Sequence, residues 1–200
     1  AMSATYRQSA VITTKKQRID PENVLLSRGP YHRLEAEMMR DQALALSGLL
    51  HNKVGGKWVK PYQPAGIWKE LANQIGENKY RKGTGNDLYR RSLYSYWKRT
   101  IPTPFMLTFD ASERAVCVLK RQSTSTPLQA LGLLNDPQFV EASRVMVQRI
   151  CATSGEDPRH CIEIAFRKLT SRYPSQQELD NLLGLFKEEL GNFNQQPSKA

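Results

Sequence analysis

Residues 89–139 read YRRSLYSYWKRTIPTPFMLTFDASERAVCVLKRQSTSTPLQALGLLNDPQF and mix aromatic, basic and turn-forming side chains more densely than the rest of the chain. The first part, Tyr89–Lys98, is aromatic, and it is followed by Pro102 and Pro104. Aromatic enrichment before a proline favours a β-strand, although the same residues also fit the period of a helix. A second apolar run, Ala115–Leu119, has a Val-Cys-Val centre. We expect the two runs to pair in a small antiparallel sheet.

The residues between the two expected strands contain a turn. Phe109, Asp110, Ala111 and Ser112 suit a turn, because Asp and Ser side chains bond nearby backbone N–H groups. Asp110 could also form a local ion pair with Arg114. That pair either stabilises the turn or, in the functional alternative, holds an acid in a binding cleft.

Signals for the start of a helix recur after residue 125. Thr126 supplies a hydroxyl cap, Pro127 occupies the first helical position and Gln129 completes a capping box. A cap followed by proline recurs at Asp136-Pro137 and Asp157-Pro158, and a second capping box at Ser175 and Glu178. The sequence therefore predicts four C-terminal helices, over Pro127–Leu134, over Pro137–Ala152, from Pro158 and from Ser175.

The N-terminal half predicts two further helices, Tyr31–Leu50 and Ile67–Gly76, because apolar residues recur there at helical spacing. The loop between them contains Trp58, Lys60 and Tyr62, and it either binds a ligand or covers the core. The expected fold class is α+β and mainly α, with a helical bundle packed on the small antiparallel sheet. Residues 1–191 are expected to form a single domain of a larger multidomain protein, with a flexible polar tail over 192–200.

The net charge of +10 is placed unevenly. All of the excess lies in residues 1–105, which hold 18 Lys and Arg against 8 Asp and Glu. Basic residues interleaved with aromatic ones suit a polyanion, a sulfated sugar or a single-stranded nucleic acid. The alternative is a solvated basic face whose aromatic residues belong to the core. The candidate binding residues are Arg90, Arg91, Tyr94, Tyr96, Trp97, Lys98 and Arg99.

Motifs for catalysis, metal binding and cofactor binding are missing from the sequence. Arg33, Glu37 and Asp41 share one face of a predicted helix, where the carboxylates could do acid–base work or could form a salt-bridged surface. The three His residues have no metal-site spacing, and no Cys-x-x-Cys-His occurs for attaching haem. We therefore predict no catalytic residue, no metal site and no cofactor in this segment. The apolar runs are too short to span a membrane.

The chain has three cysteines, too few for a disulfide framework. Cys117 lies in an expected strand, so we predict that it is buried. Cys151 and Cys161 lie near facing ends of consecutive predicted helices. A bridge between them is an alternative in an oxidising compartment.

Many separate runs of the sequence resemble a domain of unknown function found in large secreted planctomycete-type proteins. The resemblance extends over Ser3–Leu190 and is carried by motifs that include Arg33-Leu34-x-Ala36-Glu37-x-x-Arg40-Asp41, Arg90-Arg91-Ser92-Leu93-Tyr94, Trp97-Lys98-Arg99-Thr100, Phe109-Asp110-Ala111, Leu134-Asn135-Asp136-Pro137 and Arg172-x-Pro174-Ser175-x-x-Glu178.

The resemblance implies an extracytoplasmic location, periplasmic or secreted, and a place C-terminal to a cytochrome-c-like domain. Haem c would then be held elsewhere in the full-length protein, and sister domains would be partners. The leading functional hypothesis is a non-catalytic accessory domain that contacts sister domains or an anionic polysaccharide. The alternative is a hydrolase-like domain acting on polysaccharide through Glu37, Asp41 and Asp110. Nucleic-acid binding ranks third, since a secreted protein has little reason to meet DNA.

Overall fold

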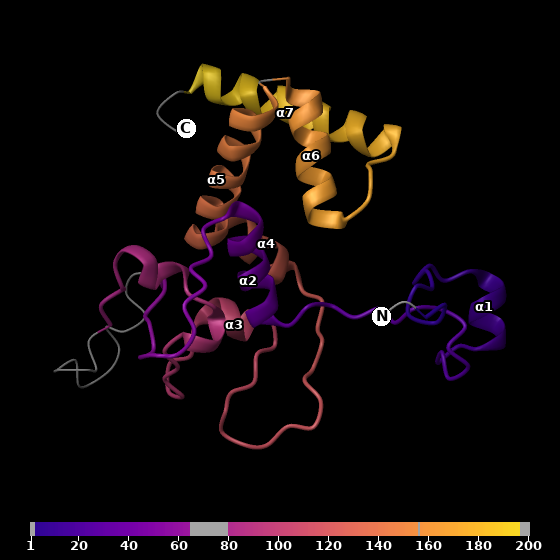
Figure 1. Ribbon diagram of the computed structural model, residues 1–200, viewed down its shortest axis with the longest axis horizontal. Helices are drawn as coiled ribbons and strands as arrows, with labels where there is room; N and C mark the ends of the chain where they lie inside the picture. The colour runs from indigo at the N-terminus through magenta and orange to yellow at the C-terminus, as the bar shows by residue number, and fades with distance from the viewer. Residues whose placement is uncertain (1–2, 65–79, 156, 197–200) are drawn as a thin grey trace. The chain divides into compact units, whose positions relative to one another are not determined.

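The computed structural model describes residues 3–64, 80–155 and 157–196 (Figure 1). The chain divides into two compact units, Ala1–Leu34 and Glu35–Ala200. The single domain expected over 1–191 stays a prediction. The predicted helix Ile67–Gly76 and the last four residues of the expected tail lie outside the described residues.

The first unit contains one short helix, α1 (Thr14–Ile19), which the sequence analysis did not predict. The Arg28 guanidinium is buried and donates hydrogen bonds to the backbone carbonyls of Asp20 and Pro21, both at 2.6 Å. The Asp20 carboxylate in turn accepts from the backbone N–H of Val24 at 2.8 Å. These contacts satisfy the polar groups of a segment with little regular structure.

Every regular element in the described part of the second unit is an α-helix or a 3₁₀ turn, and loops connect these elements. The elements are α2 (Ala36–Ser47), the 3₁₀ turns η3 (Gly85–Tyr89) and η4 (Ser92–Tyr94), α3 (Pro104–Thr108), α4 (Pro127–Asn135), α5 (Pro137–Ser154), α6 (Pro158–Thr170) and α7 (Gln176–Gln195). Helix α2 packs on α3 and α5, α4 packs on α5, α5 on α6, and α6 on α7 (Figure 1). The core buries Ala36, Phe105, Met106, Phe109 and Ala111 together, and Phe139 of α5 packs against them.

The predicted antiparallel sheet is wrong, and with it the α+β class. Within residues 3–64, 80–155 and 157–196 there is no β-strand, only isolated bridges such as His51 with Arg90. The first expected strand is replaced by η3, η4 and extended backbone. The second, Ala115–Leu119, has no regular structure, and its residues are exposed, including Cys117, whose predicted burial is therefore also wrong.

The first expected strand has other partners for its backbone. The Arg40 guanidinium donates to the carbonyl oxygens of Leu88 and Arg90, both at 2.9 Å. The carboxylate of Asp41 accepts from the N–H of Ser92 at 2.7 Å. Side chains of α2 thus satisfy backbone groups that a neighbouring strand would otherwise pair. The second run buries no face, so nothing favours strand pairing there.

The four predicted C-terminal helices are confirmed as α4 to α7, and both capping boxes form. The helix expected over Tyr31–Leu50 is shorter, because it begins at Ala36 and ends before Gly48, whose φ of 76° is the left-handed conformation that closes helices. Helix α3 was not predicted. Thr103 is its N-cap residue and Pro104 its first residue, the same order of Thr and Pro that begins α4, although the Thr103 side chain makes no capping hydrogen bond.

Candidate functional site

Two segments of the second unit that are distant in the sequence lie side by side. The N–H of Val59 donates to the carbonyl of Tyr94 at 2.8 Å, and the N–H of Tyr96 donates to the carbonyl of Val59 at 2.7 Å. Val59 is buried. Because side chains alternate along extended backbone, Trp58 and Lys60 lie on the opposite side of their segment from Val59.

A third segment is attached to the same place. The N–H of Gly83 donates to the carbonyl of Lys60 at 2.8 Å, and the hydroxyl of Tyr80 donates to the carbonyl of Pro61 at 2.5 Å. The backbone near Lys60 therefore positions Tyr80 as well as Trp58 and Tyr96. Burial raises the pKa of the Tyr80 hydroxyl, so it stays protonated and keeps donating at neutral pH.

Three aromatic rings converge on the ammonium group of Lys60. The Lys60 nitrogen lies 5.0 Å from the ring centroid of Tyr96, 5.1 Å from that of Trp58 and 5.5 Å from that of Tyr80. The rings of Trp58 and Tyr96 are themselves 4.7 Å apart. These distances suit cation–π attraction. We call Trp58, Lys60, Tyr80 and Tyr96 the Lys60 cluster.

The Lys60 cluster keeps an open side. Trp58 is 49% exposed, and the Lys60 ammonium has three N–H donors that cation–π contacts do not saturate. No salt bridge involves Lys60 within the described part of the chain. A second lysine, Lys82, lies 5.1 Å from the ring centroid of Tyr62. The arrangement can stack an indole on a flat ligand while an ammonium group meets an anionic substituent.

The predicted binding residues divide between buried and exposed positions. Arg90 is only 3% exposed, and its guanidinium donates to the backbone carbonyls of Lys53, Gly55 and Lys57 at 2.5–3.0 Å. Arg90 also lies 4.0 Å from the ring centroid of Tyr94. The guanidinium of Arg90 therefore holds the 53–57 loop.

Arg91 is 58% exposed, and its Nε lies 3.5 Å from the carboxylate of Asp41. Trp97 packs against the core, and the Arg114 guanidinium lies 4.8 Å from the centroid of the Trp97 ring. Lys98 is half-buried and Arg99 is exposed. Of the seven predicted residues, the structure brings only Tyr96 into the Lys60 cluster. A binding role for the seven stays a prediction.

The predicted acidic positions contact several different partners. Glu37 forms an ion pair with Arg121 at 2.6 Å, and although burial raises its pKa, the hydrogen bond from Arg121 and the nearby positive charge leave that pKa lowered. Asp110 accepts from the N–H and hydroxyl of Thr124, both at 2.9 Å. Arg33 belongs to the first unit. The pairs expected for Arg33 with Glu37 and for Asp110 with Arg114 stay predictions.

Sequence reasoning missed the central role of Arg40. This residue is 4% exposed, and burial lowers its pKa to about 10, which leaves it charged at neutral pH. Its Nε donates to the side-chain carbonyl of Gln138 at 2.5 Å. The available signal was its place in the Arg33–Asp41 motif, which ends in Arg40-Asp41.

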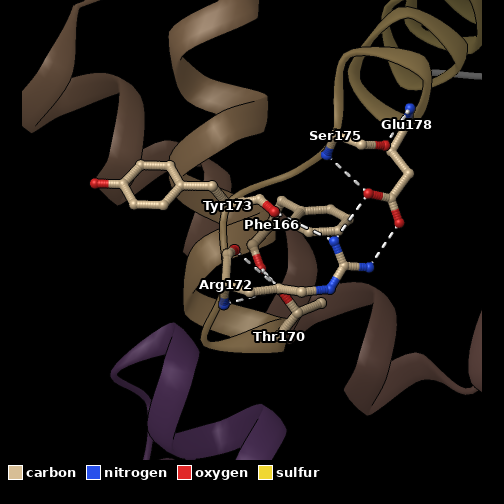
Figure 2. Close-up of polar contacts among 6 residues, drawn as sticks. All are labelled: Phe166, Thr170, Arg172, Tyr173, Ser175 and Glu178. Atoms are coloured by element: carbon tan, nitrogen blue, oxygen red, sulfur yellow. Dashed lines mark hydrogen bonds and ion pairs between the residues drawn. The ribbon is translucent and has the colours of Figure 1, made fainter. Parts of the chain in front are cut away.

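The motif Arg172-x-Pro174-Ser175-x-x-Glu178 forms the turn between α6 and α7 (Figure 2). Arg172 donates through both terminal nitrogens to the carboxylate of Glu178, at 2.6 and 2.8 Å. Glu178 also accepts from the N–H of Ser175 at 2.8 Å. Figure 2 shows the Arg172 guanidinium pointing to Glu178, with the ring of Phe166 beside it. Because these groups are hydrogen-bonded to one another, their role is to stabilise the turn.

Metal and membrane sites are not evident in the described ranges. No group of three or more His, Cys, Asp or Glu within them could hold a metal ion. None of their helices is long and apolar enough to cross a membrane. The described part of the second unit is a helical domain whose loops form the Lys60 cluster.

The chain belongs to the family described as PSD1, a protein of unknown function (DUF1553), whose model matches residues 1–186. No curated protein and no solved structure matches the chain. The resemblance to a domain of unknown function is thereby confirmed. The planctomycete source and the neighbouring cytochrome-c-like domain stay predictions.

Proposed function

We propose that this chain is a non-catalytic accessory domain that binds an anionic polysaccharide through the Lys60 cluster. The observation that carries the proposal is the convergence of three aromatic rings on one lysine, 5.0–5.5 Å from its nitrogen, beside a half-exposed indole. A sugar ring offers a flat face for the indole, and a sulfate or carboxylate substituent offers acceptors for the ammonium group.

Further basic residues near the Lys60 cluster support the choice of an acidic ligand. Lys57, Arg81 and Lys82 are exposed in the segments that carry Trp58 and Tyr80. The net charge of +10 would attract a polyanion to the chain as a whole. A chain-like ligand could therefore meet several cations along its length.

The setting of this domain is part of the proposal. The family resemblance supports a place in an extracytoplasmic multidomain protein, with sister domains as further partners and haem c held outside this segment. The hydrolase alternative finds less support, because Glu37 is paired with Arg121 and Asp110 is bonded to Thr124. Carboxylates occupied in this way suit structural roles better than acid–base catalysis.

Binding of a sulfated polysaccharide to matched lysine variants tests the proposal. Affinity for dextran sulfate would be measured by calorimetry at about 0.15 M salt, where long-range attraction is screened. We expect Lys60→Ala to weaken binding by about fivefold to tenfold, equivalent to about 1 kcal/mol. Lys187→Ala removes the same charge from an exposed position on α7 and should weaken binding by less than about twofold.

Equal losses in the two variants would contradict a specific site and leave only attraction to net charge. No binding of dextran sulfate at all would contradict the glycan proposal and favour contact with sister domains. An unrelated oligonucleotide serves as a second polyanion. Tighter binding of the oligonucleotide at the same salt concentration would favour the nucleic-acid alternative.

A further inference from the structure

Two cysteine thiols meet where α5 is followed by α6. The sulfur atoms of Cys151 and Cys161 are 3.5 Å apart, and both side chains are half-buried. Cys151 lies in the last turn of α5, and Cys161 lies in the first turn and a half of α6. The third cysteine, Cys117, is exposed and belongs to the segment between α3 and α4.

The local backbone holds the two thiols at this spacing. Gly155 ends α5 with a φ of 83°, and its N–H donates to the carbonyl of Cys151 at 3.1 Å. The N–H of Cys161 donates to the carbonyl of Asp157, the cap of α6, at 3.0 Å. The Cys161 thiol also contacts the carbonyl oxygen of Gly155 at 3.2 Å. These contacts at the end of α5 and the start of α6 hold the two side chains together.

We propose that Cys151 and Cys161 form a redox-active pair that closes into a disulfide linking α5 to α6. Bonded sulfurs lie about 2.05 Å apart, so the pair must approach by about 1.5 Å, which small changes of the side-chain torsions can supply. Both residues belong to helices that already pack on each other, so closure needs no rearrangement of the fold.

The oxidant for this step is a disulfide of the glutathione class or a thiol oxidoreductase. One cysteine thiolate attacks the oxidant, forming a mixed disulfide and releasing one thiol. The second thiolate then attacks the cysteine sulfur of the mixed disulfide, which forms the Cys151–Cys161 bond and releases the second thiol. The protein loses two electrons and two protons, and the oxidant is reduced to two thiols. The bond would persist in an oxidising compartment and open in a reducing one.

The Cys117→Ser variant isolates the pair, because it removes the exposed thiol. The full chain would be equilibrated with mixtures of oxidised and reduced glutathione and quenched with acid. It would then be transferred to denaturant at neutral pH, where thiols react with a maleimide, and weighed by intact mass spectrometry. After equilibration with oxidised glutathione we expect an unlabelled monomer whose mass is that of the reduced chain less two hydrogens. Two labels after equilibration with oxidised glutathione, or a disulfide-linked dimer as the main product, would overturn the proposal.

Folding must favour the bond if the native structure places the thiols correctly. The equilibrium constant for closure should be at least about tenfold larger in the folded chain than in concentrated guanidinium chloride. The reason is that closing the loop costs the unfolded chain conformational entropy, whereas the folded chain already holds the two thiols together. An equal or smaller constant in the folded chain would overturn the proposal. As a control, Cys161→Ser in the Cys117→Ser background should stop at the mixed disulfide, and release of the glutathione from it would contradict the assigned partner.

Discussion

Arg40 of α2 and Gln138 of α5 are bonded to each other and share one acceptor, the backbone carbonyl of Leu88. Arg40 donates to this oxygen at 2.9 Å and Gln138 donates to it at 3.0 Å, while Nε of Arg40 donates to the Gln138 side chain at 2.5 Å. The two side chains therefore connect α2 and α5 to η3, the 3₁₀ turn that contains Leu88. The cost of burying the Arg40 charge is offset by hydrogen bonds to most of its donors.

The first prediction concerns the loss of this buried guanidinium. Arg40→Met keeps much of the side-chain volume but leaves the carbonyl of Arg90 and the side chain of Gln138 without their donor. We expect the free energy of unfolding to fall by about 3–5 kcal/mol, measured by urea denaturation. Arg144→Met, at an exposed position on α5, is the matched control and should change it by less than about 0.5 kcal/mol. Similar losses for the two variants would show that the buried hydrogen bonds of Arg40 do not stabilise the fold.

The second prediction orders three neighbouring arginines by stability. Arg90→Ala should lower the free energy of unfolding by about 2–4 kcal/mol, because it removes the buried guanidinium that donates to three carbonyls of the 53–57 loop. Arg91→Ala should cost less than about 1 kcal/mol, since more than half of the Arg91 side chain is exposed to solvent. Arg99→Ala should be neutral within about 0.5 kcal/mol. Thermal and urea unfolding check the order, and a larger loss for Arg99→Ala than for Arg90→Ala would refute it.

The third prediction is a pH dependence at the turn between α6 and α7. The hydrogen bond from Arg172, followed by those from the N–H and hydroxyl of Ser175, lowers the pKa of Glu178 from 4.5 to about 2. A lowered folded pKa means that the contribution to stability is present above 4.5 and is lost as the pH falls through about 2. The difference in melting temperature between the native chain and Glu178→Gln should therefore shrink between these two pH values.

Glu188→Gln is the control for that measurement, because Glu188 is an exposed acid on the same helix. Its difference from the native chain should stay small at every pH. A Glu178→Gln difference that does not vary with pH would show that the carboxylate contributes no charge-dependent stability to the turn.

The parts of the fold that depend on neighbouring residues were predicted well. Thr126 with Gln129, and Ser175 with Glu178, form capping boxes within four residues of chain, so the starts of α4 and α7 could be inferred from sequence. Helix α3 begins with the same order of Thr and Pro, but Pro102 and Pro104 were taken as the end of a strand.

The parts that depend on distant residues could not be inferred in the same way. Tyr89–Lys98 has the composition of a strand, but its backbone is bonded by Arg40 and Asp41, about fifty positions earlier in the chain. The Lys60 cluster likewise needs Val59 to pair with Tyr94 and Tyr96. Sequence reasoning singled out Trp58, Lys60 and Tyr62 as a candidate binding loop, but it had no means of placing Tyr80 and Tyr96 around Lys60.

The most direct test of the account is the affinity of Trp58→Ala for dextran sulfate at about 0.15 M salt. This substitution removes the exposed indole and leaves the net charge of +10 unchanged, so it separates the Lys60 cluster from general attraction between opposite charges. Trp58→Phe, which keeps an aromatic ring, is the control, and circular dichroism would establish that both variants fold. The account predicts that Trp58→Ala binds about tenfold more weakly, equivalent to about 1.4 kcal/mol, and that Trp58→Phe recovers most of the loss. Unchanged affinity in a folded Trp58→Ala variant would contradict the proposal that the Lys60 cluster binds the polysaccharide.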